Sequence, residues 1–268
     1  MRRSKKKSKD LIGLVIIGFV LLTFLAGAIT YFKLSTESAE INKKTNCRID
    51  GVYDVNVIIL DISDSLNTIQ VIQVEKIFKK IMSNLTIGEQ VQIYLINDEV
   101  QTKLKPILKL CNPGDGKNKN IYINNPTLLK KKWEKSFKQP LLKALENIKE
   151  GTTSNTSPII ESIQVVNNIA FPFDKKDTLN YKITIISDMI QNSKNISFYK
   201  DTKAYINKFS KTSNYYKVQT DLSNTELNIY IIRREKSEHL QSRFYINFYI
   251  NIFEKMNAKI NKIKMIDG

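Results

Sequence analysis

Two acidic turns follow apolar runs in this chain, and their side chains could bind a metal ion. Asp61, Ser63 and Ser65 follow the apolar run VIIL in an Asp-x-Ser-x-Ser pattern, and Asp188 comes shortly after the run ITII. A carboxylate and two hydroxyls on a short arc provide the hard oxygen ligands that Mg²⁺ and Mn²⁺ prefer. We therefore predict a divalent-metal site to which both turns contribute.

The strands and helices around these turns predict where the turns lie. Apolar, β-branched segments predict strands, and amphipathic periodicity between them predicts helices. The expected strands are 52–62, 88–98, 103–111, 181–189, 226–234 and 258–266, and the expected helices are near 69–81, 127–149, 157–170, 200–209 and 237–256. This alternation predicts one α/β domain, a doubly wound, mostly parallel six-stranded sheet with helices on both faces.

Both acidic turns come directly after strands that are apolar almost throughout. The strand expected at 52–62 has the continuous apolar pattern of a central strand that is buried on both faces. In open α/β sheets, ligands bind at the carboxyl ends of the strands where the strand order reverses. We therefore expect the turns that contain Asp61 and Asp188 to lie at that edge of the sheet.

This combination resembles the metal-ion-dependent adhesion site of von Willebrand factor type A domains. Asp61, Ser63 and Ser65 match the first metal-binding segment of that family, and Asp188 matches its acidic residue after the fourth strand. The resemblance covers residues 55–266 and includes the order of strands and helices. It implies the family's fold, with Mg²⁺ or Mn²⁺ as the cofactor.

The family's threonine ligand between these two segments has no direct match in this chain. The resemblance sets Ser157 and Pro158 in its place, which makes Ser157 the ligand candidate, with Thr153 and Thr156 as nearby alternatives. Ser157 is also a suitable N-cap for the helix that follows, with Pro158 at the first helical position. Met189 stands after the second acidic turn, where the family often has glycine.

The resemblance also implies a function. In the family, an Asp or Glu carboxylate of a partner protein fills the one open position on the metal, and the charge of the metal compensates a carboxylate that is costly to desolvate. We therefore predict a protein-binding module rather than an enzyme. The P-loop, nucleophile-elbow, HExxH and CxxC motifs are not present in the sequence.

Three other interpretations stay open from the sequence alone. Asp and Ser are good turn and helix-capping residues, so Ser65 or Asn67 could cap the next helix without any metal. A metal-independent scaffold could bind anionic envelope polymers or nucleic acid through its basic surface. The third and least favoured interpretation is a metal-assisted hydrolase built on Asp61 and Asp188.

Residues 11–32 predict a membrane anchor, since they carry no charge. A helix of this length crosses a hydrocarbon core of about 30 Å. A signal peptide is the alternative, but the apolar run continues past the small-residue triplet at 26–28. The basic tail at 1–10 favours a cytoplasmic N-terminus of a single-pass protein, which places the remainder in the periplasm or outside the cell. We expect a polar stalk at 33–50 and the domain at 51–268.

The composition limits the kinds of metal site and partner. The 268 residues include 42 Lys and Arg against 26 Asp and Glu, a net charge of +16, with one His and two Cys. One His and two Cys exclude a His-rich or Cys-rich metal site within one chain. Residues 1–10 carry +5 of this net charge and the remaining +11 is spread over the chain, which favours solvated helix faces and disfavours nucleic acid as a partner.

The two cysteines are Cys47 and Cys111. In an oxidising compartment a disulfide between them and a pair of buried thiols are both compatible with the sequence, which does not fix the distance between them. Cys111 ends the strand expected at 103–111, in which Pro106 cannot donate to a ladder. That strand is therefore expected at an edge of the sheet.

Overall fold

The computed structural model divides the chain into two compact units, Met1–Ile41 and Asn42–Gly268. The residues that it describes are 2–36, 40–51, 53–61, 63–96, 104–117, 125–148, 154, 156–171 and 178–268.

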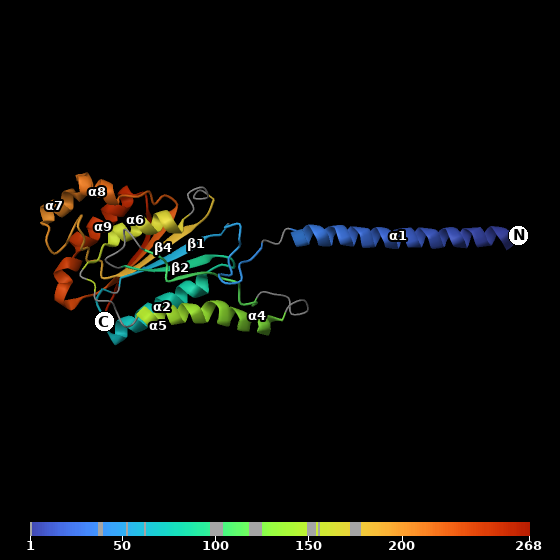
Figure 1. Ribbon diagram of the computed structural model, residues 1–268, viewed down its shortest axis with the longest axis horizontal. Helices are drawn as coiled ribbons and strands as arrows, with labels where there is room; N and C mark the ends of the chain where they lie inside the picture. The colour runs from blue at the N-terminus through green and yellow to red at the C-terminus, as the bar shows by residue number, and fades with distance from the viewer. Residues whose placement is uncertain are drawn as a thin grey trace. The chain divides into compact units, whose positions relative to one another are not determined.

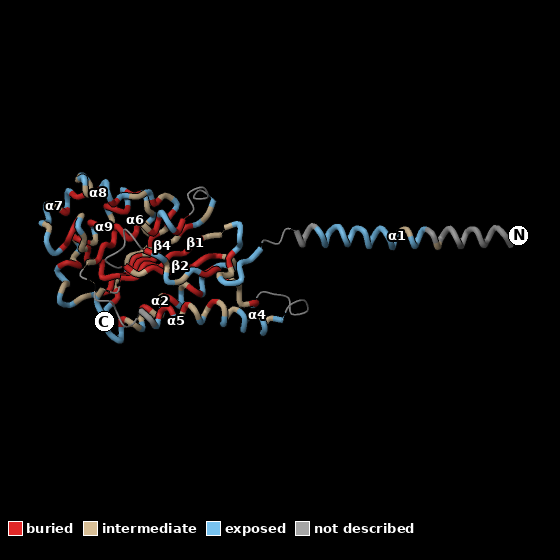
Figure 2. Tube along the Cα trace, viewed as in Figure 1, coloured by how far each residue is buried: buried red, intermediate tan, exposed pale blue. Residues whose placement is uncertain are grey.

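The first unit contains the helix α1 (Arg2–Thr36). Its segment Val15–Phe32 has a mean hydropathy of 2.3 and is not buried against the protein. Figure 2 shows the described part of this helix exposed along most of its length. In the described part of the chain, α1 is the helix that is long and apolar enough to cross a membrane, a criterion that a signal sequence also meets.

The second unit is built on a six-stranded sheet with the order β3-β2-β1-β4-β5-β6. All neighbouring strands are parallel except β2 and β3, which pair antiparallel. The strands are β1 (Val55–Leu60), β2 (Gln90–Leu95), β3 (Leu108–Cys111), β4 (Tyr181–Ser187), β5 (Thr225–Ile232) and β6 (Lys259–Ile266). This confirms the predicted fold class and the edge position of the strand that follows Pro106.

Helices cover both faces of the sheet (Figure 1). On one side lie α2 (Thr68–Asn84), α4 (Pro126–Trp133) and α5 (Gln139–Ile148), and on the other lie α6 (Ile159–Ala170), α7 (Lys203–Lys208), α8 (Ser213–Val218) and α9 (Arg243–Lys255). The second unit is therefore a three-layer α/β fold of the doubly wound kind.

The core lies on both faces of β1. Val57 and Ile59 pack into the cluster beneath α6 and α9, whereas Ile58 and Leu60 pack into the cluster beneath α2 and α5. Every residue of β1 is buried, as Figure 2 shows for the centre of the sheet. The continuous apolar pattern of this strand thus reports burial on both faces.

Two expected helices are interrupted. The helical run expected at 127–149 contains a π-helical turn, Glu134–Lys138, between α4 and α5. Pro140 follows this turn, and because it lacks an amide hydrogen and its ring clashes with the carbonyl four residues earlier, the α-helical pattern widens there. The last expected helix is divided by Ser242, whose extended backbone separates a 3-10 segment from α9.

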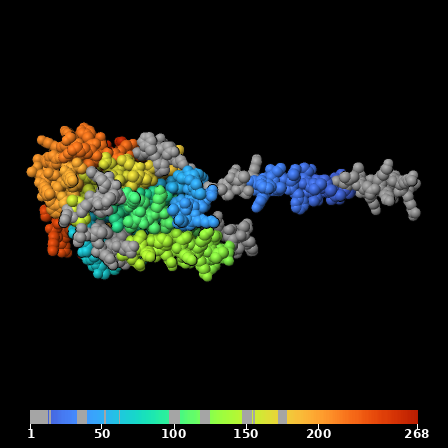
Figure 3. Space-filling model, viewed as in Figure 1, coloured from blue at the N-terminus to red at the C-terminus, as the bar shows by residue number. Residues whose placement is uncertain are grey.

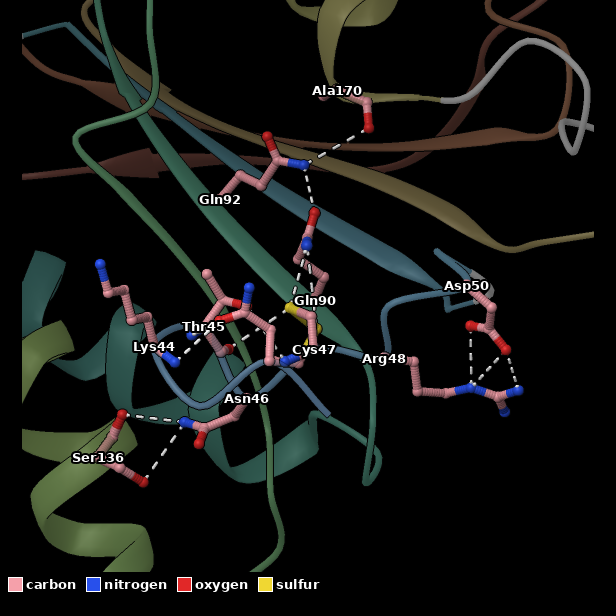
Figure 4. The surroundings of a disulfide bond; sticks show 12 residues. Lys44, Thr45, Asn46, Cys47, Arg48, Asp50, Gln90, Gln92, Ser136 and Ala170 are labelled. Carbon is pink, nitrogen blue, oxygen red and sulfur yellow. Dashed lines mark hydrogen bonds and ion pairs between the residues drawn. A yellow bond between two sulfur atoms is a disulfide. The ribbon is translucent and has the colours of Figure 1, made fainter. Parts of the chain in front are cut away.

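The structure joins Cys47 to Cys111 by a disulfide, with their Cα atoms 4.9 Å apart (Figure 4). The segment around Cys47 also bonds to the fold, since Cys111 N donates to Thr45 O at 2.8 Å and the side-chain Nδ2 of Asn46 donates to Ser136 O at 3.2 Å. In Figure 3 the light-blue surface of this segment lies against the green surface of the sheet edge. The folded unit therefore includes residues 42–50, which the sequence analysis places in the stalk.

Candidate metal centre

The two acidic turns lie where the strand order reverses. The order runs β3-β2-β1 on one side and β4-β5-β6 on the other, so the reversal falls between β1 and β4. Asp61 follows β1 and Asp188 follows β4, and their exposed fractions are only 3% and 6%. Two buried carboxylates thus share the position at which open α/β sheets bind their ligands.

Hydroxyl groups surround the carboxylate of Asp61. Its Oδ2 accepts hydrogen bonds from Ser157 Oγ and from Ser187 Oγ, the latter at 3.0 Å. Its Oδ1 accepts the backbone N–H of Ser63 at 3.2 Å. The side chain of Asp61 therefore joins three segments of the chain, namely its own turn, the end of β4 and the loop before α6.

Ser157 reaches Asp61 because its loop is tied to the loop that follows β4. The backbones of Ser157 and Asn192 exchange two hydrogen bonds, of 2.9 and 3.0 Å. The prediction that Ser157 is the N-cap of α6 is wrong, because Pro158 occupies the N-cap position and no side chain caps the helix. The hydroxyl of Ser157 is directed to Asp61 instead, and its role lies in the site rather than in the helix.

Ser63 and Ser65 present hydroxyls without hydrogen-bond partners among the described residues, and they are half-buried and exposed, respectively. The helix after them is capped by Asn67, whose side chain accepts from Gln70 N while the Gln70 side chain accepts from Asn67 N. Ser65 is thus not needed as a cap, and both hydroxyls are available to a ligand.

Thr156 and Thr153 are the two alternative ligand candidates of the third segment. Thr156 is half-buried beside Ser157, and its carbonyl accepts a hydrogen bond from Ser154 Oγ at 2.6 Å. Thr153 lies outside the described residues. The structure brings the side chain of Ser157 to Asp61, to which its hydroxyl donates a hydrogen bond.

Burial makes the charge of Asp188 costly. The pKa of Asp188 is raised to about 7, first because burial removes water from the carboxylate and second because the charge of Asp61 is near. The N–H of Ile190, which donates to Asp188 Oδ1 at 2.9 Å, and the charge of Arg234 oppose this rise. The pair of carboxylates therefore carries negative charge that the surrounding groups compensate only in part.

The turn after β4 has a strained backbone. Met189 has a φ of 59°, in the left-handed region that a side chain disfavours, and its N–H donates to Ser187 Oγ at 2.8 Å. Glycine, which has no side chain, adopts this conformation without such strain. In this chain the Met189 side chain is buried in the core beneath α9, which offsets part of the strain.

Arg234 is a residue of the site that the sequence analysis missed. Its Nε lies 3.5 Å from Asp188 Oδ2, and its two terminal nitrogens donate to the carbonyls of Ser65 (2.7 Å) and Asp64 (3.0 Å). Arg234 follows β5, the neighbour of β4, so the rule that polar residues after parallel strands share an edge could have found it. It fastens the Asp-x-Ser-x-Ser turn to the end of β5 and supplies part of the compensating charge.

Amide side chains hold the surrounding loops. Gln241 Nε2 donates to the carbonyls of Asp188 (2.8 Å) and Ile232 (2.7 Å). The buried carboxylate of Glu161, at the start of α6, accepts from Gln191 Nε2 at 2.9 Å and from Asn195 Nδ2 at 2.8 Å. These bonds fix the loop after β4 against both α6 and the segment after β5.

The donor set fits a hard divalent cation. The described residues contain no cluster of three or more His, Cys, Asp and Glu side chains that could hold a metal, so a metal here would depend on hydroxyls as well as carboxylates. Asp61, Asp188 and the hydroxyls of Ser63, Ser65 and Ser157 supply only oxygen, the ligand atom of Mg²⁺ and Mn²⁺. A cation would also neutralise the two buried carboxylates.

Comparisons with known proteins show a distant likeness in fold. No protein-family model matches the chain, and no curated protein matches its sequence. Among solved structures, it is similar to the crystal structure of an aerotolerance-related membrane protein from Bacteroides fragilis NCTC 9343 that carries multiple mutations to serines. The identity is 12% and the TM-score 0.37, over 77% of this chain and 90% of the other. A likeness this distant supports no conclusion about function.

Proposed function

We propose that this chain is a membrane-anchored binding module that recruits a partner protein through a divalent metal at the carboxyl ends of β1 and β4. The observation that carries the proposal is the Asp61 carboxylate, which binds the hydroxyls of Ser157 and Ser187 beside a second buried carboxylate, Asp188. Two acidic groups buried together without a full countercharge are costly for stability alone and suit a site that receives a cation.

Each side chain has a definite part in this proposal. Asp61 and Asp188 would hold Mg²⁺ or Mn²⁺ directly or through water, and the hydroxyls of Ser63, Ser65 and Ser157 would complete the protein ligands. The bound cation would supply the positive charge that receives an Asp or Glu carboxylate of the partner. The carbonyl bonds of Arg234 would keep the turn that bears the two serines in place.

The apolar segment Val15–Phe32 would hold this module at a membrane. The basic residues before it favour an N-terminus in the cytoplasm, with the folded unit in the periplasm or outside the cell. The disulfide between Cys47 and Cys111 supports this side of the membrane, because disulfides persist in oxidising compartments.

Metal-dependent capture tests the proposal. Full-length protein with an affinity tag is cross-linked in its native membranes in Mg²⁺ or in EDTA, and the captured proteins are identified by mass spectrometry. We expect a partner that is captured in Mg²⁺, lost in EDTA and lost with Asp61→Ala. The matched control is Asp54→Ala, which removes the aspartate at the other end of β1 and should retain the partner. A partner that persists in EDTA and with Asp61→Ala would contradict the proposal.

A further inference from the structure

The described residues cover one face of the sheet only partly on its β4-β5-β6 half. Near their carboxyl ends these strands contribute Ile186, Ile232 and Ile266 to the apolar cluster beneath α2. Nearer their amino ends the same face carries polar side chains, including Lys182 and Thr184 of β4. Parallel sheets normally have both faces covered, so an open polar stretch on such a sheet needs an explanation.

This stretch forms a groove between α2 and β6. It consists of two hollows of about 440 and 190 Å³, which adjoin because both are lined by Ile77, Lys80, Tyr230 and Lys262. The floor comes from β1, β4 and β5 and the walls from α2 and β6. Its size is in the range of sites that bind small ligands or short segments of a partner.

The groove is basic, because five lysines and one acidic residue, Glu226, line it. Lys76 and Lys80 of α2 and Lys262 and Lys264 of β6 line it, and none of the four has an ion-pair partner in the part of the chain that the structure describes. The ammonium group of Lys262 lies 5.1 Å from the centre of the Tyr230 ring, which places its charge over the floor. The residues described along the groove therefore favour an anionic occupant.

An unpartnered buried acceptor lies in the floor. Asn56 of β1 is 8% exposed, and its Oδ1 has no hydrogen-bond partner among the described residues, while its Nδ2 donates to Glu89 Oε1 at 3.4 Å. A buried acceptor without a donor costs stability, so it marks a position at which a ligand's donor would be favourable. Anionic charge alone does not satisfy this atom.

We propose that this groove binds an acidic peptide segment of a partner protein. Its carboxylates would contact the lysines of α2 and β6, and its backbone N–H groups would supply the donor for Asn56. A polyphosphate chain offers oxygen acceptors only, so it would satisfy the lysines but not Asn56. Lysines on an edge strand also protect it from pairing with other chains, but Lys76 and Lys80 belong to a helix and Asn56 to a central strand.

The test measures binding of a fluorescent poly-aspartate peptide to the full-length protein in detergent by fluorescence anisotropy. EDTA is present throughout, so the metal site is excluded and failure of this inference is separable from failure of the proposed function. We expect binding that weakens with added salt and is about tenfold weaker in the double variant Lys80→Glu, Lys262→Glu. The matched control is Lys131→Glu, Lys132→Glu on α4, which makes the same change of charge outside the groove and should leave the affinity unchanged.

A second variant separates a peptide from an anionic polymer. Asn56→Ala should weaken poly-aspartate binding and leave the binding of inorganic polyphosphate unchanged, with circular dichroism confirming the fold. The inference is overturned if poly-aspartate does not bind in EDTA, or if the control on α4 loses as much affinity as the groove variant. It is equally overturned if polyphosphate binds more tightly than the peptide and Asn56→Ala affects neither ligand.

Discussion

The two ends of the β1 and β4 pair are polar for different reasons. At the amino ends, half-buried Asp54 accepts the backbone N–H of Asn180 at 2.9 Å and its side-chain amide at 3.2 Å, so one carboxylate has two neutral donors. At the carboxyl ends, Asp61 and Asp188 are both buried, and the charge of Asp61 makes the charge of Asp188 more costly. The first arrangement has a structural role, whereas the second leaves negative charge that the surrounding groups compensate only in part.

The surroundings of the two ends follow the same division. Near the amino end of β2, buried amides bond to one another and to the disulfide region, with Gln92 Nε2 donating to Gln90 Oε1 and Gln90 Nε2 lying 3.2 Å from Cys47 Sγ (Figure 4). Around the carboxyl ends, the hydroxyls of Ser63 and Ser65 lack partners among the described residues. Satisfied polar groups indicate a structural role and available ones a binding role, and Asn56 Oδ1, which lacks a partner among the described residues, is an exception near the amino end of β1.

The largest expected effect is a loss of stability in the region of the disulfide, near the amino end of β2. Replacing Cys47 and Cys111 by Ser opens a loop with a sequence separation of 64 residues, and chain entropy predicts a loss of about 4 kcal/mol in the free energy of unfolding. Denaturant unfolding of the full-length protein measures the loss. Stabilisation by Mg²⁺ should persist in the variant, and its disappearance would show that the two ends are coupled.

The next effect is on pH dependence at the carboxyl end. The pKa of Asp188 is raised from 3.8 to about 7 in the folded, metal-free protein, so folding favours the protonated carboxyl. Its contribution to stability is complete below pH 3.8, falls as the pH rises and is gone above about pH 7, a loss of up to about 4 kcal/mol.

Unfolding in EDTA between pH 4 and 8 checks this loss, with pH values chosen on either side of the shifted pKa. Asp188→Asn should flatten the decline because it removes the titrating group. A decline of the same size in Asp188→Asn would assign it to other residues.

A smaller effect is expected at the third segment. Ser157→Ala removes a donor to a buried carboxylate and should cost about 2 kcal/mol of stability in EDTA, as well as weakening the response to metal. Ser157→Thr keeps the hydroxyl and should retain most of that response. Thermal unfolding with and without Mg²⁺ compares the stabilisation by metal in the two variants. If Mg²⁺ stabilises the Ala variant as much as the Thr variant, Ser157 is excluded as a ligand.

The smallest effect is expected at Asp54. Asp54→Ala removes an acceptor that is half exposed to water, so the loss should be about 1 kcal/mol or less. Denaturant unfolding measures it, and the metal response should equal that of the wild type. A reduced metal response in this variant would break the division between the two ends.

The sequence predicts most of the fold and the acidic part of the site. Apolar β-branched runs mark the strands, and because carboxyl ends of parallel strands meet at one edge, the sequence alone places Asp61 and Asp188 at the same edge. Arg234 was missed because its reach to Asp64 and Ser65 spans segments far apart in the chain. The role of Ser157 depends on a backbone bridge between two loops, which local capping preferences do not reveal.

The sequence contains a pattern that indicates the open groove. Treating the strands simply as apolar overlooks this pattern. In β5, half-buried Glu226 and Asn228 alternate with buried residues, and half-buried Lys182 does so in β4. Alternation of this kind is typical of a strand with one face toward water, in contrast to the apolar run VIIL that ends β1. The period-2 pattern thus distinguishes the half-covered strands of this sheet from the central one.

Thermal unfolding of the full-length protein in detergent, titrated with Mg²⁺ and Mn²⁺, tests the central claim most directly. At a metal concentration of about one hundred times the dissociation constant, the wild type should gain about 2.7 kcal/mol, a shift of a few degrees in Tm. Asp54→Ala should show the same shift and Asp61→Ala none. The absence of a shift in the wild type at millimolar metal, or an undiminished shift in Asp61→Ala, would contradict a metal centre at the carboxyl ends of β1 and β4.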